Sequence, residues 1–186
     1  MMKERNVKNK KYQNKTEINL LISMFIRYIL ALIFGLNIWF LELIFLPLTF
    51  YPVLFILNLF FNVKSSIPYL LVNGSLISIV SACIAASAYY FLIAINLITP
   101  MDIKKRIKTM AFSFLFLLVV NILRIIFLSI LYVNSFSFFD LTHKILWYGL
   151  SAIFVVVIWL LTVKIFKVKA IPFYSDFIYL KKLSKR

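Results

Sequence analysis

The feature that most constrains this chain is an apolar run over residues 110–133, about 24 residues long. A single helix of about 20 apolar residues is enough to cross the hydrocarbon core of a bilayer. Near the middle of the run stands Arg124, and Asn121 lies three residues earlier on the same helical face. A cationic side chain at membrane depth is costly, so such residues usually face the interior of a helix bundle and mark a functional site. We therefore interpret the remainder of the chain as the surroundings of this arginine.

The hydrophobic content of the chain excludes an ordinary soluble domain. The sequence has 186 residues, of which 63% are hydrophobic, and its mean hydropathy is +0.98. A soluble domain of this size cannot bury that much apolar surface. Several further apolar runs predict an all-α polytopic membrane protein, because helices satisfy their own backbone hydrogen bonds in lipid. The first run is too long for a cleavable signal peptide, and no small-residue cleavage site follows it.

The positive charges indicate one side of a membrane rather than a nucleic-acid partner. The net charge is +15, but six of the 21 Lys and Arg residues lie in residues 1–15, four in residues 104–108 and seven from residue 164 to the end. These clusters flank apolar runs, as expected of cytoplasmic segments. We therefore predict basic cytoplasmic tails at residues 1–17 and 167–186, the first of them disordered. Within the second, residues 173–183 are weakly amphipathic and are expected to lie on the inner leaflet.

We expect a single transmembrane domain over residues 18–166 with about four spans. The spans cover approximately residues 20–46, 82–98, 110–133 and 143–163. With a cytoplasmic N-terminus, this order places every dense basic cluster inside and leaves only Lys64 and Lys144 outside. The chain is therefore predicted to be a multi-pass cell-membrane protein with both termini in the cytoplasm.

The segment between the first two spans allows two interpretations. Residues 48–63 are apolar but short, and we interpret them as a helix lying in the outer interface. Residues 67–80 contain Asn73-Gly74 between two apolar runs, which predicts a β-hairpin because a type I′ turn needs positive φ at both central positions. The alternative is two very short spans, six in total, which leaves the inside–outside order of the later spans unchanged.

This topology places three chemically distinctive residues on one side of the membrane. Cys83, the only cysteine, lies at the outer start of the second span, and His143, the only histidine, at the outer start of the fourth. Arg124 lies roughly two turns, or about 10 Å, below the outer end of the third span, a depth that a long arginine side chain largely covers. We therefore expect the three side chains to meet in one cavity that opens to the outer face.

Each of the three residues has a role in thiol chemistry. Cys83 is the candidate nucleophile, because nearby cations and a helix N-terminus favour the thiolate form of a cysteine. His143 is the candidate acid/base, which activates the thiol and later protonates a leaving amine. Arg124 is the candidate group for stabilising the oxyanion that develops on an attacked carbonyl. This chemistry needs no metal and no organic cofactor, and one cysteine allows neither an intramolecular disulfide nor a cysteine-based metal site.

Three further polar residues are candidates for supporting roles. Asn121 is placed to orient Arg124 or to donate a second hydrogen bond to the reacting oxygen. Asp140, three residues before His143, is expected to cap the fourth span or to hold the imidazole in one tautomer. Glu42, near the outer end of the first span, is expected to pair with Arg124 or His143.

The same residues also allow interpretations without catalysis. Cys83 can be a small apolar filler, His143 an interfacial residue, and Arg124 one half of a structural ion pair with Glu42. A transport or channel subunit would line its path with Arg124 and Glu42 and would be indifferent to Cys83. In a membrane scaffold the polar residues would only pack.

The region from residue 67 to residue 143 resembles the archaeosortase/exosortase family of membrane transpeptidases. The resemblance lies in the hairpin-like LVNGSLISIVSAC, the helix-starting SACIAASAY, the segment NILRI, and His143 followed by Gly149. It implies that Cys83 is the nucleophile, Arg124 the oxyanion-side cation and His143 the acid/base. The chain departs from the family after the cysteine, where many members carry Ser-Gly and this chain has Ile84-Ala85.

The resemblance also implies a reaction and its partners. The chain would be a cysteine peptidase/transpeptidase whose substrates are secreted proteins with a C-terminal sorting signal, made of a short motif, a transmembrane helix and a basic end. Cleavage would occur at the outer face, and the acceptor would be the amine of a lipid headgroup, with water giving plain proteolysis. Nucleic acid is not an expected partner.

Overall fold

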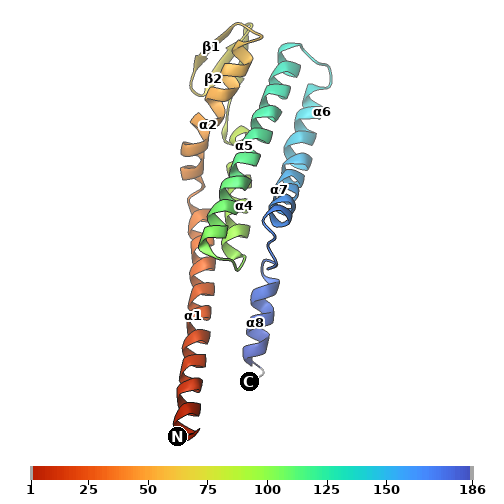
Figure 1. Ribbon diagram of the computed structural model, residues 1–186. Helices are drawn as coiled ribbons and strands as arrows, with labels where there is room; N and C mark the ends of the chain where they lie inside the picture. The colour runs from red at the N-terminus through yellow and green to blue at the C-terminus, as the bar shows by residue number, and fades with distance from the viewer. Residues whose placement is uncertain (1, 185–186) are drawn as a thin grey trace.

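The computed structural model describes residues 2–184, which form a mostly helical bundle with a small sheet at one end (Figure 1). In chain order the elements are α1 (Met2–Leu36), α2 (Ile38–Asn58), β1 (Val63–Ser66), β2 (Tyr69–Val72), β3 (Ser75–Ser78), α3 (Ser81–Ile84), α4 (Ala86–Ile98), α5 (Ile103–Val133), α6 (Phe139–Lys144), the π-helix η1 (Ile145–Leu150), α7 (Ser151–Ile165) and α8 (Tyr174–Ser184).

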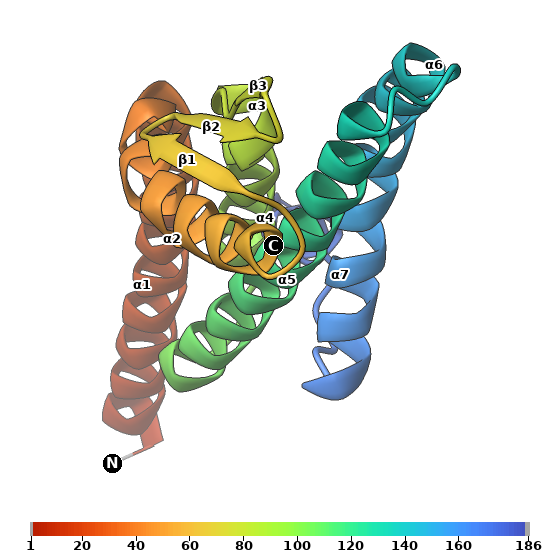
Figure 2. The ribbon, with the colours of Figure 1, turned by 90° about the horizontal axis from the view of Figure 1, so that it is seen from above.

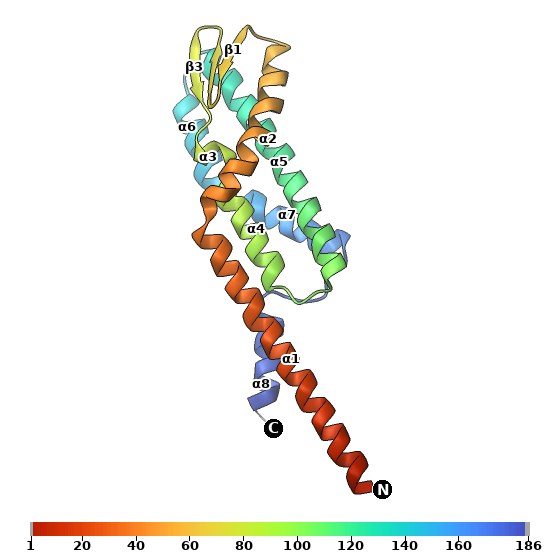
Figure 3. The ribbon, with the colours of Figure 1, turned by 90° about the vertical axis from the view of Figure 1, so that its left-hand side faces the viewer.

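The first long helical path changes direction at Asn37, between α1 and α2 (Figure 3). Asn37 has φ −118° and ψ 44°, and its side-chain amide donates to the carbonyl of Ile33 at 2.9 Å. A continuous helix over residues 20–46 was predicted, and this boundary is wrong. Asparagine competes for backbone hydrogen bonds, which explains why the break falls here rather than at the prolines.

The helix α2 continues through both prolines to Asn58, so the prediction of a separate helix over residues 48–63 is also wrong. A proline removes one helical hydrogen bond. The helix nevertheless persists because it buries Phe50, Val53 and Leu57 almost completely in the core of the bundle.

The sheet confirms the predicted hairpin and adds one strand to it. β2 and β3 are antiparallel and joined by Asn73 and Gly74, whose φ angles are 48° and 89°, as a type I′ turn requires. β1 pairs antiparallel with the other side of β2 and was not predicted. Its four residues, Lys64 and two serines among them, carry little apolar pattern, and the pairing becomes evident only when the hairpin is in place.

The predicted second span is interrupted at Ala85, between α3 and α4. Ala85 has φ 59° and ψ 37°, in the left-handed region. The four-residue α3 contains Cys83, and α4 then runs down the bundle beside α1. Gly35 marks the contact between α1 and α4, since a Cβ atom there would lie 2.7 Å from the Tyr90 hydroxyl.

The helix α5 begins at Ile103, so most of the predicted inner loop is in fact its first two turns. Lysine and arginine are good helix formers, which explains the extension. The end of α5 at Val133 agrees with the predicted end of the third span. Beyond it, α6 and η1 lead into α7, with a bend of 42° between residues 139–149 and α7. Viewed from above, the sheet lies over α3 and α4, and α6 lies apart from it beyond α5 (Figure 2).

The described residues contain two helices long and apolar enough to cross a membrane, α2 and α5. A third span results if the bent path from Phe139 to Ile165 is counted as one. The apolar part of α1, Leu20–Leu36, and α4 are shorter apolar helices. Large apolar side chains are exposed along the bundle, for example Phe25, Phe55 and Leu115. These helices are compatible with membrane insertion, but the four predicted spans are not all reproduced.

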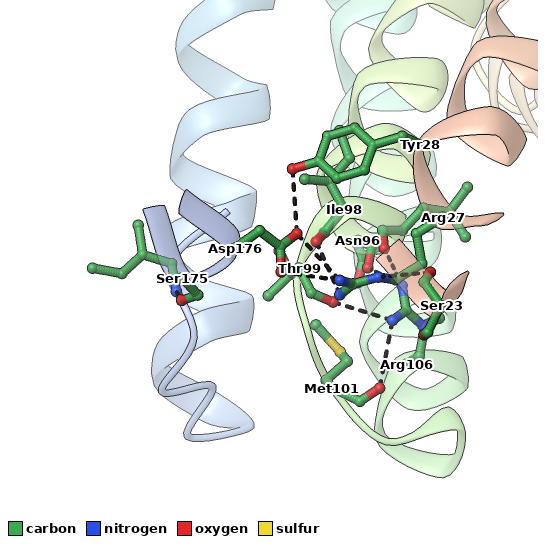
Figure 4. A network of polar contacts seen from close by, with 12 residues as sticks. Ser23, Arg27, Tyr28, Asn96, Ile98, Thr99, Met101, Arg106, Ser175 and Asp176 are labelled. Atoms are coloured by element: carbon green, nitrogen blue, oxygen red, sulfur yellow. Dashed lines mark hydrogen bonds and ion pairs between the residues drawn. The ribbon is translucent and has the colours of Figure 1, made fainter. Parts of the chain in front are cut away.

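At the end opposite the sheet, two arginines hold the C-terminal end of α4 (Figure 4). Arg106 of α5 donates to the carbonyls of Asn96, Leu97, Thr99 and Met101, the last three at 2.7, 3.1 and 3.4 Å. These carbonyls have no partner within α4 because they lie at or beyond its end. A cation at a helix C-terminus is also favoured by the helix dipole.

The second arginine of this network connects the C-terminal helix to the bundle. Arg27 of α1 donates to the Ile98 carbonyl at 3.3 Å and to the Asp176 carboxylate at 3.0 Å, and Tyr28 donates to the same carboxylate at 3.2 Å. The helix α8 is therefore attached to α1 (Figure 4). Residues 2–17, predicted to be disordered, continue α1.

Candidate functional site

The sheet leads directly into the turn that carries Cys83. After β3 the chain stays extended through Val80, with φ −88° and ψ 170°, and then enters α3. The amide of Cys83 donates to the Val80 carbonyl at 2.8 Å. Ile84 is only 3% exposed and anchors the turn in the core, whereas Cys83 is half-buried and its thiol is free.

Two polar side chains of α5 hold the backbone of α3. Asn121 donates to the carbonyl of Cys83 itself at 2.7 Å, and Arg124 donates through Nη2 to the carbonyl of Ala82 at 3.2 Å. Both carbonyls lie in the short α3, which ends at Ile84, and helical hydrogen bonding is interrupted at Ala85. The prediction that Asn121 orients Arg124 is therefore wrong: the two side chains act in parallel on neighbouring carbonyls.

The residue that orients Arg124 is Ser151, at the start of α7, which sequence reasoning missed. Arg124 donates through Nη1 to Ser151 Oγ at 2.8 Å, and this hydroxyl donates in turn to the Leu146 carbonyl at 3.1 Å. Ser151 directly follows the π-helix η1, a kind of local irregularity frequent at functional sites. In the sequence it is one small polar residue in an apolar run, and no spacing connects it to Arg124.

Arg124 carries its charge without a carboxylate partner among the described residues. The ion pair found there joins Arg27 to Asp176 at the other end of the bundle. Arg124 Nε is buried without a hydrogen-bond partner. The expected pairing of Glu42 with Arg124 or His143 is wrong.

The physical reason is depth along the bundle. Because α2 extends to Asn58, Glu42 lies about 24 Å below its upper end, whereas Arg124 lies about 14 Å below the end of α5, and both ends reach the same level in Figure 3. Glu42 is also not among the residues that line the cavities around Cys83 and Ser151, both of which Arg124 lines.

His143 lies in α6, within a ladder of aromatic rings. Its ring stacks on Phe139 at 5.6 Å and on Trp147 at 5.9 Å between centroids, as side chains four residues apart on a helix do. Asp140 is exposed, makes no cap hydrogen bond and does not bond His143. Its predicted supporting role is wrong because its side chain is exposed, whereas the ring of His143 stacks on the aromatic rings of Phe139 and Trp147.

One cavity of about 270 Å³ brings the three predicted residues together. Its lining contains Cys83 of α3, Arg124 of α5 and His143 of α6. β3 and the aromatic rings of Tyr132, Phe139 and Trp147 complete much of the remaining surface. The Cys83 thiol and the His143 imidazole are not hydrogen-bonded to each other in the described part of the chain, although both line the same cavity.

The cavity combines a few reactive polar groups with a mostly apolar lining. It offers one thiol, one imidazole and one guanidinium against an apolar, aromatic background. No group of three or more His, Cys, Asp or Glu side chains suited to a metal ion occurs among residues 2–184. A thiol, a proton carrier and a cationic hydrogen-bond donor are the groups that acyl transfer requires.

Comparison of the chain with protein-family models, with curated proteins and with solved structures gives no match.

Proposed function

We propose that this protein is a membrane-embedded cysteine peptidase/transpeptidase of the archaeosortase/exosortase type. The observation that carries the proposal is the single cavity lined by Cys83, Arg124 and His143. These residues come from three different helices, α3, α5 and α6, and α3 is separated from the other two by the whole of α4. A filler cysteine, an interfacial histidine and a structural arginine would have no reason to share one cavity.

The reaction begins with attack of the Cys83 sulfur on the scissile carbonyl carbon of the substrate. His143 accepts the thiol proton as the sulfur–carbon bond forms, and the carbonyl oxygen becomes an oxyanion. Arg124, which has no carboxylate partner in the described structure, stabilises this negative charge. When the carbon–nitrogen bond breaks, His143 returns the proton to the leaving amine, and a thioester remains on Cys83.

The thioester is resolved by a second nucleophile. An acceptor amine, in our proposal that of a lipid headgroup, attacks the thioester carbon while His143 removes its proton, and the thiol of Cys83 is regenerated. Water in the same position gives hydrolysis. The substrates are secreted proteins whose C-terminal sorting signal presents its cleavage motif at the outer face, and the basic tails at the opposite end of the bundle lie in the cytoplasm.

The backbone after the cysteine supports the family assignment within this proposal. The family often carries glycine two positions after the nucleophile, and the corresponding residue here, Ala85, has φ 59°. Glycine is the residue that enters this left-handed region without strain. The local geometry that the family sequence would favour is thus present, although the side chain differs.

The test replaces Cys83, Arg124 and His143 with alanine in turn, with Lys144→Ala as the control. Lys144 is exposed and adjacent to His143. Each of the three variants should lower the removal of C-terminal segments from secreted proteins in the producing cells by at least about 100-fold, measured by mass spectrometry of their C-terminal peptides. Each variant should remain folded, as checked by thermal unfolding in detergent. Full processing by Cys83→Ala would reject the proposal.

A further inference from the structure

The strand β3 is an edge of the sheet, and its free side is defined by the register. The strand order is β1-β2-β3, and Ile77 faces Leu70 while Ser75 faces Val72. In a hairpin with a two-residue turn, the pair of residues next to the turn is hydrogen-bonded. Beyond it, non-hydrogen-bonded and hydrogen-bonded pairs alternate along the strands. The bond from the Ile79 amide to the Pro68 carbonyl, at 2.9 Å, continues this alternation.

The backbone groups of Leu76 and Ser78 therefore point away from β2. Neither residue makes a backbone hydrogen bond to another element within the described chain. The chain remains extended as far as Val80, so the free edge covers about 13 Å from residue 76 to residue 80 at roughly 3.3 Å per residue.

This free edge borders the cavity that contains the candidate nucleophile. Leu76, Ser78 and Val80 all line it, and the chain passes from Val80 into the turn that carries Cys83. The opposite wall is formed by α5, α6 and the aromatic rings of the His143 ladder. A segment lying along the edge would thus run towards the sulfur atom.

The sequence of the edge lacks the features that usually protect an exposed strand. Natural edge strands are blunted by lysine, proline or inward-pointing charge. Residues 75–80, SLISIV, contain neither charge nor proline. The opposite edge of the same sheet, β1, carries Lys64. The two edges differ as expected if the one beside the cavity receives another strand.

We propose that the substrate peptide binds as an added β-strand along β3, pairing its backbone with Leu76 and Ser78. The occupant is an extended peptide of about four residues, and the inference rests on the proposed function. Main-chain pairing supplies register and affinity, and side chains on alternate positions enter the aromatic cavity or face outward. Pairing of this kind places the carbonyl that follows the strand beside Cys83.

The first test removes one outward amide from each edge of the sheet. Ser78→Pro deletes the amide that faces the cavity, and Ser65→Pro is its matched control on β1. The Asn73 amide donates to the Asn62 carbonyl, and hydrogen-bonded residues alternate along β1 from that point. The Ser65 amide therefore points away from β2, towards the free edge of β1. Proline is tolerated at such positions because the lost amide takes no part in the ladder.

The probe is a pooled library of capped tetrapeptides with a C-terminal vinyl sulfone, applied to the full chain reconstituted in lipid vesicles. The Cys83 sulfur adds to the double bond and its proton passes to the adjacent carbon. Mass spectrometry measures the rate, and methyl vinyl sulfone reports the intrinsic reactivity of the thiol. Ser78→Pro should slow library labelling about tenfold without changing the methyl vinyl sulfone rate, and Ser65→Pro should change neither.

The second test alters the peptide and leaves the protein unchanged. Two libraries are compared, each N-methylated at one of two adjacent positions of the peptide. Their rates of Cys83 labelling should differ by about tenfold, because only alternate peptide amides face β3. Equal rates for the two libraries, or library labelling no faster than that by methyl vinyl sulfone, would overturn strand addition. The proposed function is tested separately: retained processing by Cys83→Ala rejects it, whereas lost processing combined with equal library rates rejects only the binding mode.

Discussion

The two ends of the bundle each contain a partly or fully buried arginine, and they use it in opposite ways. Arg106 is surrounded by four carbonyls, and its neighbour Arg27 is paired with Asp176. Arg124 at the sheet end has one carbonyl and one hydroxyl, a buried Nε without a partner and an adjacent cavity. A cation surrounded by acceptors contributes to folding, whereas a cation that lines a cavity and has no carboxylate partner is available to a negatively charged ligand group.

The largest expected effect is on activity, at the unsatisfied end. Arg124→Ala should lower processing by about 10²–10³-fold, the loss typical of removing one oxyanion donor. The measurement is the amount of C-terminally processed secreted protein in the producing cells. Arg124→Lys keeps the charge but lacks the planar guanidinium group. Its level of processing should therefore lie between that of Arg124→Ala and that of the unchanged protein. Equal loss of thermal stability and activity in both variants would show that this arginine is structural as well.

At the satisfied end, the expected effect is on stability. Arg106→Ala leaves several carbonyls at the end of α4 unpaired and should lower the free energy of unfolding by about 3 kcal/mol. Denaturation in detergent measures the change, and the exposed Lys108→Ala on the same helix is the control. Activity per folded molecule should be preserved. Loss of activity without loss of stability would remove the contrast between the two ends.

A smaller effect is expected where α8 joins the bundle. Asp176→Asn removes the charge that pairs with Arg27 and should cost about 2 kcal/mol, visible as faster proteolysis of the C-terminal helix. The comparison variant is Asp102→Asn, since Asp102 lies at the same end but is exposed and makes no cap hydrogen bond. Unchanged proteolysis of Asp176→Asn would show that α8 is held by apolar contacts alone.

The smallest effect concerns the turn behind the candidate nucleophile. Ala85→Gly should stabilise the protein by about 1 kcal/mol, because alanine is strained at φ 59°. In Ala88→Gly the same exchange falls inside the helix α4 and should destabilise by about 1 kcal/mol. Thermal unfolding in detergent distinguishes the two signs. Destabilisation by both substitutions would indicate that packing of the Ala85 methyl group stabilises the protein by more than the strained backbone at this residue destabilises it.

Several features of the site were predictable because they depend on local patterns. The length of the apolar run around Arg124 indicated a long apolar helix, and Asn73-Gly74 indicated the hairpin, since only a few residues enter positive φ readily. The order of apolar runs and basic clusters placed Cys83 and His143 at the end of the bundle where the cavity lies. The partners of the site residues were not predictable in the same way: Ser151, not Asn121, orients Arg124.

The sequence alone determined which residues could face one another. Helical periodicity gives the face of the helix on which a residue lies, and the distribution of basic residues gives the end of the bundle at which it lies. The tertiary structure decided which of them do, because a hydrogen bond depends on ångström-scale axial shifts between helices that no spacing encodes. Because α2 continues past Pro47, Glu42 lies too far down the bundle to reach Arg124, and the edge of β3 beside Cys83 stays free because β1 pairs with β2 and not with β3.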